Sequence, residues 1–387
     1  MNRICPICDS DDKKHLYTQN FYNNVISLMQ KYDVVVCNSC EFVFADKIPS
    51  QEDFNCYYTE MSKYEFSFNE GVVSKDYLDH FRKIADFIIP EIKKKDAKII
   101  DIGCSTGALL SVLKERGYEN LLGVDPSESC VKTVKCLYSI KSKISNISDL
   151  STNEKFDVII LSAVLEHLVD FDGALNKINL ILKDDGVLFL EIPDAERFEK
   201  FIFTPFQQFS IEHINYFTEN SIKNLLLKFA MQIVKIEKSE NRINQTIDPD
   251  LFILSKKSNN SASKIKKDIN GLVKIEEYIN KCKHADRETK KIIKEKFFTK
   301  DKVIVWGIGT FTQRLIGADL DLSKILYFVD SNIRYKGKKI QNIEIKSPND
   351  IKEHVPIFIS TYSYQDEVIN QIQNILKLKN EIIKIYD

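Results

Sequence analysis

Hydrophobic and polar residues alternate with two different periods along the middle of the chain. Short apolar runs such as KIIDIG, NLLGVD, FDVIILSAV and VLFLEIPD indicate buried strands. Stretches such as ALLSVLKERG and ALNKINLILKDDG have the spacing of helices, and Gly117 is expected to end the first of them. This alternation from residue 97 to 255 predicts an α/β domain whose mainly parallel sheet is covered on both faces.

The segments on either side of this domain have other patterns. Residues 49–96 form an aromatic and charged bridge that ends in a predicted helix, DYLDHFRKIADFIIPEI. The apolar face of that helix consists of Leu78, Phe81, Ile84, Phe87 and Ile88. Residues 256–301 begin within the run SKKSNNSASK and continue with helical periodicity, so a helical linker is expected there.

A second α/β unit, Rossmann-like in pattern, is expected over residues 302–387. The run VIVWGIG indicates a strand that enters a glycine turn, and ILYFVD indicates the next strand. Gly307 and Gly309, followed by Asp330, resemble the start of a dinucleotide-binding motif. Thr312 stands where the third glycine of that motif would be, so the pattern is weak evidence for a bound dinucleotide.

Size and charge narrow the class of protein. At 387 residues and 43% hydrophobic content, two to three folded domains are expected. No run approaches the roughly 20 apolar residues of a membrane span, and the first residues lack a secretory signal pattern. The net charge of −1 gives no general attraction to nucleic acid or to anionic membranes, so neither is an expected partner.

Four cysteines in the first 48 residues have the spacing of a metal site. Cys5 and Cys8 form one CxxC pair, and Cys37 and Cys40 form a second after an unusually long gap. Four thiolates would fill the tetrahedral shell of zinc, so residues 1–48 are predicted to be a module with a structural zinc ion. The alternative is four unrelated core cysteines. The other five cysteines of the chain are scattered, which favours a reducing, cytoplasmic location.

The segment IIDIGCSTGALL is typical of S-adenosylmethionine (SAM) methyltransferases. Asp101, Gly103 and Gly107 supply the acid and the small residues that let the backbone approach the methionine part of SAM. Ser105 replaces the usual middle glycine, and it is tolerated if its φ is negative. Asp125 ends the next strand, where a carboxylate can accept both ribose hydroxyls.

Three further features concern the same pocket. Asn146 is the candidate for an adenine contact after the third strand, and Cys104 is interpreted as a small packing residue of the loop. The run LSAVLEHL (161–168) favours SAM over NAD, because it is similar to the segment after the fourth strand in class I methyltransferases. Glu166 and His167 in this run are interpreted mainly as packing residues.

Nearly the whole chain resembles the SAM-dependent sugar methyltransferases that carry a zinc-binding module. The resemblance rests on CPIC, CNSC with EFVFAD after it, DIGCSTG, LEHL, IEHINYFT and the C-terminal FVDSN and YKGKKIQNIEI. Members of this family include C-methyltransferases that act on nucleotide-linked keto-deoxysugars. The resemblance implies three parts: a zinc module, a SAM-binding domain, and a C-terminal Rossmann-like domain that helps to hold a nucleotide-sugar.

The same resemblance implies the acid–base residues. Glu212 and His213 match the pair of the family, with histidine as the base, and Tyr64 is the candidate for a tyrosine of the bridge, with Tyr58 as the rival. Ser210 stands where C-methylating members carry tyrosine, which leaves methylation of carbon or of oxygen open. A base is needed because a sugar hydroxyl or a carbon beside a ketone must lose a proton before it accepts a methyl group.

Two other functions remain open at this point. One is an RNA methyltransferase whose zinc module binds nucleic acid, although the net charge of −1 does not favour binding to RNA. The other is a binding scaffold without turnover, because Ser105 and Ser210 depart from the pattern at two functional positions. The expected partner is a small molecule, a sugar or nucleotide-sugar, and the oligomeric state is left open.

Overall fold

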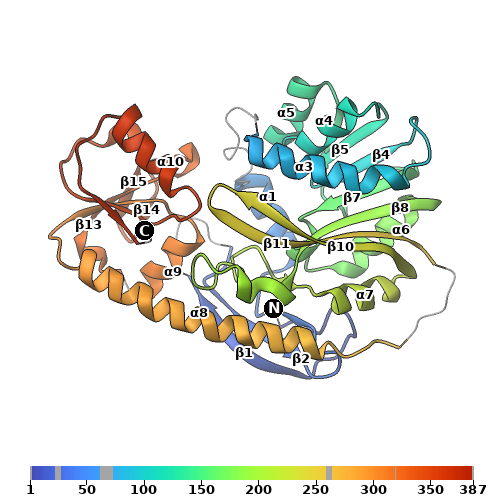
Figure 1. Ribbon diagram of the computed structural model, residues 1–387, viewed down its shortest axis with the longest axis horizontal. Coiled ribbons are helices and arrows are strands. Elements are labelled where there is room, and N and C mark those ends of the chain that lie inside the picture. Colours follow the sequence, from blue (N-terminus) through green and yellow to red (C-terminus); the bar gives the residue numbers. More distant parts are fainter. Residues whose placement is uncertain (1, 22–27, 62–72, 259–263, 319, 386–387) are drawn as a thin grey trace.

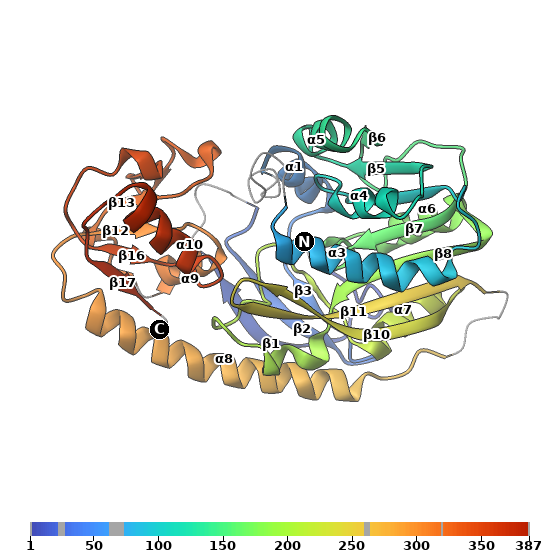
Figure 2. The same ribbon diagram turned by 45° about the horizontal axis from the view of Figure 1, so that its top comes forward.

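In the computed structural model, the described part of the chain is organised by three β-sheets (Figure 1). The structure describes residues 2–21, 28–61, 73–258, 264–318 and 320–385. A long helix, α8 (Ile269–Lys296), runs along one side of the molecule and connects the central part to the C-terminal part (Figures 1 and 2). Among the described residues, no helix has both the length and the apolar character that crossing a membrane requires.

The N-terminal sheet is antiparallel and has the order β1-β2-β3-β9. Its strands are β1 (Lys13–Asn20), β2 (Lys31–Cys37), β3 (Val43–Asp46) and β9 (Asn215–Tyr216). The run KYDVVVC forms β2, as its β-branched residues favour, and its three valines are buried. The last strand comes from much later in the sequence, because Val43 of β3 pairs with Tyr216 of β9. The N-terminal residues are therefore joined to a distant loop by main-chain hydrogen bonds.

The central sheet has seven strands in the order β10-β11-β8-β7-β4-β5-β6. The strands are β4 (Ile99–Ile102), β5 (Leu121–Asp125), β6 (Lys141–Ile144), β7 (Phe156–Ser162), β8 (Leu182–Pro193), β10 (Met231–Ile243) and β11 (Thr246–Lys257). The pairs among β4 to β8 are parallel, whereas β11 runs antiparallel to β8 and to β10. This arrangement confirms the mainly parallel α/β sheet, to which the structure adds a long antiparallel hairpin at one edge.

Helices cover both faces of the central sheet, as the apolar strands require. They are α3 (Lys75–Ile88), α4 (Ala108–Glu115), α5 (Glu128–Tyr138), α6 (Phe171–Ile181) and α7 (Glu219–Lys228). One core joins α3, α4 and α5 to one face, and another joins α6 and α7 to the opposite face. The burial of each leucine or isoleucine side chain in these layers contributes about 1.5–3 kcal/mol to the stability of the folded domain. The helix expected at the end of the bridge is α3, and it belongs to this core. The bridge also holds α1 (Gln51–Met61).

The C-terminal part is a smaller six-stranded sheet in the order β14-β15-β13-β12-β16-β17. Its strands are β12 (Val303–Trp306), β13 (Ile325–Val329), β14 (Lys339–Ile340), β15 (Ile343–Lys346), β16 (Ile357–Ile359) and β17 (Ile382–Lys384). The helices α9 (Thr310–Ala318) and α10 (Gln365–Asn370) accompany it. All strand pairs except β14 with β15 are parallel, so the second α/β unit expected here is present.

Two sets of polar contacts hold the C-terminal part against the centre. On one side, the Arg314 guanidinium donates to the Pro205 carbonyl oxygen at 2.7 Å and to Asp286 at 2.9 Å. On the other, Asn244 at the tip of the β10–β11 hairpin donates through Nδ2 to the Ser363 carbonyl oxygen at 3.0 Å and to Glu367 at 2.9 Å. The first set is largely buried and the second is exposed.

Candidate active site

One cavity of about 980 Å³ lies at the carboxyl ends of the central parallel strands and continues to the C-terminal part; we call it the central cavity. Its wall includes Asp101 after β4, Asp125 after β5, and the loop that holds His213. The glycine turn after β12, including Gly307, completes the wall. Ligands of open α/β sheets bind at this edge, so the cavity lies where the fold predicts a site.

The loop after β4 approaches its neighbours so closely that side chains are excluded. Gly103 has φ +85°, and a Cβ there would lie 2.5 Å from Cγ2 of Val164. Gly107 has φ +87°, and a Cβ there would lie 2.8 Å from Cγ2 of Val134. Gly103 lines the cavity, whereas Gly107 is the residue that precedes α4 and is not part of the wall.

Ser105 departs from the expectation of a negative φ, because its φ is +48°. The loop turns through left-handed residues at alternate positions, and Ser105 lies between Gly103 and Gly107 in that turn. Its main-chain N–H donates to Oδ2 of Asp125 at 2.9 Å, and this hydrogen bond holds the strained residue in place. A residue other than glycine in this left-handed backbone conformation lowers the stability of the fold by about 1–2 kcal/mol.

The two acids predicted for the donor pocket differ in their surroundings. Asp125 is fixed by two main-chain donors, Ser105 N–H on Oδ2 and Ser127 N–H on Oδ1 at 2.8 Å. Asp101 is only 2% exposed, and its Oδ1 has no hydrogen-bond partner within the described ranges. Burial raises the pKa of Asp101 to about 8, with further contributions from Asp125 and Glu191. Asp101 therefore presents a buried oxygen with unused bonding capacity beside the cavity.

Cys104 and Asn146, the other residues predicted for this pocket, also line the cavity. Cys104 is buried, and burial raises the pKa of its thiol well above the ordinary value, as expected for a packing residue. The Asn146 side chain closes a turn with Asp149, accepting from the Asp149 N–H at 2.9 Å and donating to its carboxylate at 2.6 Å. Its Nδ2 thus already has an acceptor in the structure.

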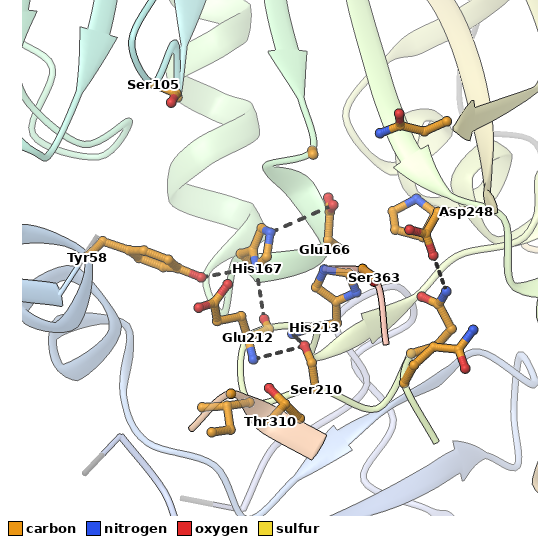
Figure 3. A pocket seen from close by; sticks show the side chains of 18 of the residues that line it. Tyr58, Ser105, Glu166, His167, Ser210, Glu212, His213, Asp248, Thr310 and Ser363 are labelled. Atoms are coloured by element: carbon orange, nitrogen blue, oxygen red, sulfur yellow. Dashed lines mark hydrogen bonds and ion pairs between the residues drawn. The ribbon is translucent and has the colours of Figure 1, made fainter. Parts of the chain in front are cut away.

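The Glu212–His213 pair lies in the middle of the cavity wall, on the loop before β9 (Figure 3). Ser210 Oγ accepts the main-chain N–H of Glu212 at 3.3 Å and that of His213 at 3.0 Å. Ser210 therefore holds the turn that presents the pair. Tyr64, the predicted tyrosine of the bridge, lies outside the described residues.

Two neighbouring tyrosines of α1 reach this loop instead. The Tyr57 hydroxyl donates to Oε1 of Glu212 at 2.9 Å. The Tyr58 hydroxyl lies 3.0 Å from Nδ1 of His167 (Figure 3). The same Nδ1 lies 3.0 Å from the Glu212 carbonyl oxygen, and the rings of His167 and His213 are 5.0 Å apart in a T-shaped contact. Sequence reasoning missed Tyr57. His167, which it interpreted mainly as a packing residue, lines the cavity together with Tyr57.

The four N-terminal cysteines converge on one point. The sulfurs of Cys5 and Cys40 are 3.5 Å apart, those of Cys8 and Cys37 are 3.4 Å apart, and all four lie within 4.8 Å of one another. Zn–S bonds of about 2.3 Å in a tetrahedron place sulfurs roughly 3.8 Å apart, so the set fits a zinc ion. Cys37 is the last residue of β2 in the N-terminal sheet, and none of the four cysteines lines the central cavity.

The C-terminal glycine turn is built like the donor loop. Asp330 accepts the Ile308 N–H on Oδ2 at 3.1 Å and the Asn332 N–H on Oδ1 at 2.9 Å, as Asp125 does with its two main-chain donors. Thr312, in place of the third glycine, is buried and donates to the Gly307 carbonyl oxygen at 2.8 Å. The threonine fills the space between helix and turn that a glycine would leave.

Comparisons with known families divide the chain in the same way. Residues 76–236 match the model of a methyltransferase domain, and residues 299–383 match a model described as C2185-like, N-terminal. The central part is therefore a methyltransferase domain.

Curated relatives agree with this assignment over different lengths. The ubiquinone biosynthesis O-methyltransferase of Bradyrhizobium diazoefficiens is 31% identical over 97 residues, which are 24% of this chain and 38% of that protein. The human mitochondrial enzyme of the same name is 31% identical over 103 residues, 24% of this chain and 28% of that protein. The chain thus spans well under half of these relatives. The C-methyltransferase NovU of Streptomyces niveus is 19% identical over 366 residues, 89% of this chain and 83% of that protein.

Solved structures of methyltransferases also align with part of the chain. A SAM-dependent methyltransferase from Clostridium acetobutylicum is 17% identical with a TM-score of 0.39, over 53% of this chain and 100% of its own. The 1,6-didemethyltoxoflavin-N1-methyltransferase of Burkholderia thailandensis is 13% identical with a TM-score of 0.43, over 57% of this chain and 98% of its own.

Proposed function

We propose that this protein is a SAM-dependent methyltransferase that acts on a sugar, carried as a nucleotide-sugar, with His213 as the base. The observation that carries the proposal is the continuity of the central cavity from Asp101 past His213 to Gly307. A donor, an acceptor and a nucleotide bound to the acceptor can lie along one such space. The alignment with the C-methyltransferase NovU supports the same proposal, because it extends over 89% of this chain.

The residues of the donor loop fit SAM. Gly103 lets the backbone pass close to a ligand, and the Asp125 carboxylate, fixed by two main-chain donors, is at the place where such a carboxylate accepts ribose hydroxyls. The unused Oδ1 of Asp101 is an acceptor for an ammonium group. When bound, SAM supplies an electrophilic methyl group, and its cationic ammonium would favour the ionised form of Asp101.

The acceptor loses its proton to His213 in this proposal. An imidazole titrates near neutral pH and can take a proton from a hydroxyl, or from a carbon beside a ketone. Tyr57 orients the Glu212 carboxylate through a hydrogen bond of 2.9 Å, and that carboxylate is placed to bind a sugar hydroxyl. The ring of His167 packs against that of His213 and limits the positions that His213 can take, and Tyr58 contacts His167.

The N-terminal cysteines hold a structural zinc ion in this proposal. Four thiolates leave no open coordination position, so the ion would take no part in the methyl transfer. Its effect on the site would be indirect. The sheet that contains Cys37 also contains β9, which follows His213 by one residue and pairs with β3.

A substrate panel together with one variant tests the proposal. The protein is incubated with SAM and a series of nucleotide-sugars, and mass spectrometry and NMR locate the new methyl group. His213→Ala should reduce turnover by about 10²–10⁴-fold, the usual contribution of a general base, with SAM affinity within a few-fold of the original. The control is His284→Ala, because His284 is an exposed residue of α8. Turnover of His213→Ala within a few-fold of the control would exclude the base role.

A further inference from the structure

A second group of metal-binding side chains lies on the wall of the central cavity, apart from the cysteines. His80 comes from α3, Glu191 from the end of β8, and Asp250 from β11. All three residues are buried, with His80 4% and Asp250 6% exposed. The strands β8 and β11 are neighbours, and α3 packs on that face of the sheet, which brings the three side chains together. No sequence motif connects them.

The hydrogen bonds of this group are incomplete. Nε2 of His80 lies 2.5 Å from Oε1 of Glu191, and Ser162 Oγ donates to Oε2 of the same carboxylate. The other ring nitrogen of His80, Nδ1, and Oδ2 of Asp250 are buried without a hydrogen-bond partner in the part of the chain that the structure describes. Leaving a polar atom buried and unbonded costs about 1–3 kcal/mol, so two such atoms beside one cavity suggest a missing ligand.

The charges around Asp250 also favour a cation. Burial raises the pKa of Asp250 well above its ordinary value, and the neighbouring Glu191, Asp248 and Glu166 raise it further. Arg197 lies nearby, but its guanidinium donates to the Asp194 carboxylate at 2.6 Å and to the Asp250 carbonyl oxygen at 2.8 Å. The Asp250 carboxylate therefore lies among other carboxylates and receives no hydrogen bond from that cation.

We propose that His80, Glu191 and Asp250 bind a divalent metal ion on the wall of the central cavity. One ligand atom from each residue lies within 4.8 Å of the others. Bonds of about 2.0–2.2 Å to one ion require ligand atoms roughly 3–4.3 Å apart, so shifts of a few tenths of an ångström complete the site. Nitrogen and carboxylate oxygen together suit Mn²⁺, Fe²⁺, Co²⁺ or Zn²⁺.

Three protein ligands leave coordination positions open toward the cavity, which all three residues line. An oxygen atom of a bound ligand or a water molecule can fill those positions. The four cysteines differ from this site, because their four thiolates would fill every coordination position of a zinc ion. A ligand with two neighbouring oxygens, such as a diol or a hydroxyketone, would chelate the ion and gain a fixed orientation. Binding of the ion itself does not depend on the proposed methyl transfer.

Manganese titration of the full-length protein with its cysteine site filled by zinc tests this proposal. Mn²⁺ is the probe because thiolates bind it weakly, and the EPR signal of free Mn²⁺ reports the bound fraction. We expect one Mn²⁺ per chain, and at least tenfold weaker binding in Asp250→Asn, which keeps the shape of the side chain. His80→Gln should give the same loss, and circular dichroism checks that both variants are folded.

The matched control is Asp248→Asn. Asp248 lies on the same strand, and its Oδ1 accepts from Gln208 at 2.9 Å, but it is not a member of the three-residue group. Binding in this control should weaken much less than in Asp250→Asn, because Asp248 contributes negative charge near the site but no ligand atom. No stoichiometric Mn²⁺ in the original protein would overturn the proposal. Equal losses in Asp248→Asn and Asp250→Asn would also overturn it, because they would show general attraction to negative charge.

Discussion

Replacing Gly103 with alanine should damage both the fold and the donor pocket, and the structure separates two causes. The first is backbone strain, since an alanine at φ +85° costs about 1–2 kcal/mol. The second is the contact of 2.5 Å between the new Cβ and Val164, because overpacking costs about 1–3 kcal/mol. Together they predict a loss of about 2–5 kcal/mol in the stability of the central domain.

Gly117→Ala is the matched control for the backbone strain. Gly117 has φ +86°, nearly the same as Gly103, but nothing lies within 4 Å of the position its Cβ would take. This variant should lose only about 1–2 kcal/mol. Urea unfolding followed by circular dichroism compares the two midpoints, and calorimetry compares SAM affinity, which should fall only in Gly103→Ala.

A double variant identifies the contact responsible. Adding Val164→Ala to Gly103→Ala removes the atom that the new Cβ meets, so part of the lost stability should return. If Gly103→Ala were no less stable than Gly117→Ala and bound SAM equally well, the close approach would not be the reason for the glycine. The reasoning about the donor loop would then be refuted.

Three further predictions concern other parts of the molecule. Ser105→Gly should raise the unfolding midpoint, because it relieves a residue at φ +48°, and an unchanged midpoint in urea would contradict the strain. Chelating the proposed zinc should unfold the N-terminal sheet first, which proteolysis within residues 1–48 would detect, whereas an unchanged digestion pattern would argue against a metal there. In the folded protein, Asp101 keeps its proton up to its pKa of about 8, whereas in the unfolded chain it loses the proton near the ordinary pKa of 3.8. The contribution of this group to the free energy of unfolding therefore falls as pH rises between these two values. The melting temperature of Asp101→Asn, measured relative to that of the original protein, should therefore rise as pH increases from 5 to 8. A difference in melting temperature that stays constant over this range would contradict the raised pKa.

The parallel core of the fold could be predicted because its signal is local. Strands buried on both faces need continuous apolar runs, and FDVIILS became β7 while LLGVD became β5. The β10–β11 hairpin was not predicted. Its strand MQIVKIEKSENRI lies at the sheet edge and carries charges that stay in solvent, so its pattern does not indicate a strand clearly. The domain continues to Lys257, slightly beyond the expected end at 255.

The candidate site was predictable to the extent that its residues follow strands in a motif. Asp101 and Asp125 end neighbouring parallel strands, and strand order alone brings such residues to one edge. Tyr57 contacts Glu212 from helix α1, which is far away in the sequence, and no sequence spacing predicts that contact. A serine was expected to be tolerated at position 105 if its φ is negative, but the φ of Ser105 is +48°, and its main-chain N–H donates to Asp125. The roles of the cysteines and of His213 remain predictions.

The pairing of β3 with β9 means that the central domain is not an autonomous unit. Arg3 strengthens the connection, since its guanidinium donates to the carbonyl of Ala45 at 3.0 Å and to the side chain of Asn215 at 3.0 Å. A chain shortened to begin after residue 48 would leave the edge of β9 without its neighbour, next to His213. We therefore expect that attempts to isolate the central domain without the N-terminal sheet will fail. If the proposed zinc ion and the proposed base role of His213 hold, loss of the zinc ion should also slow methyl transfer, although no residue of the cavity wall is changed.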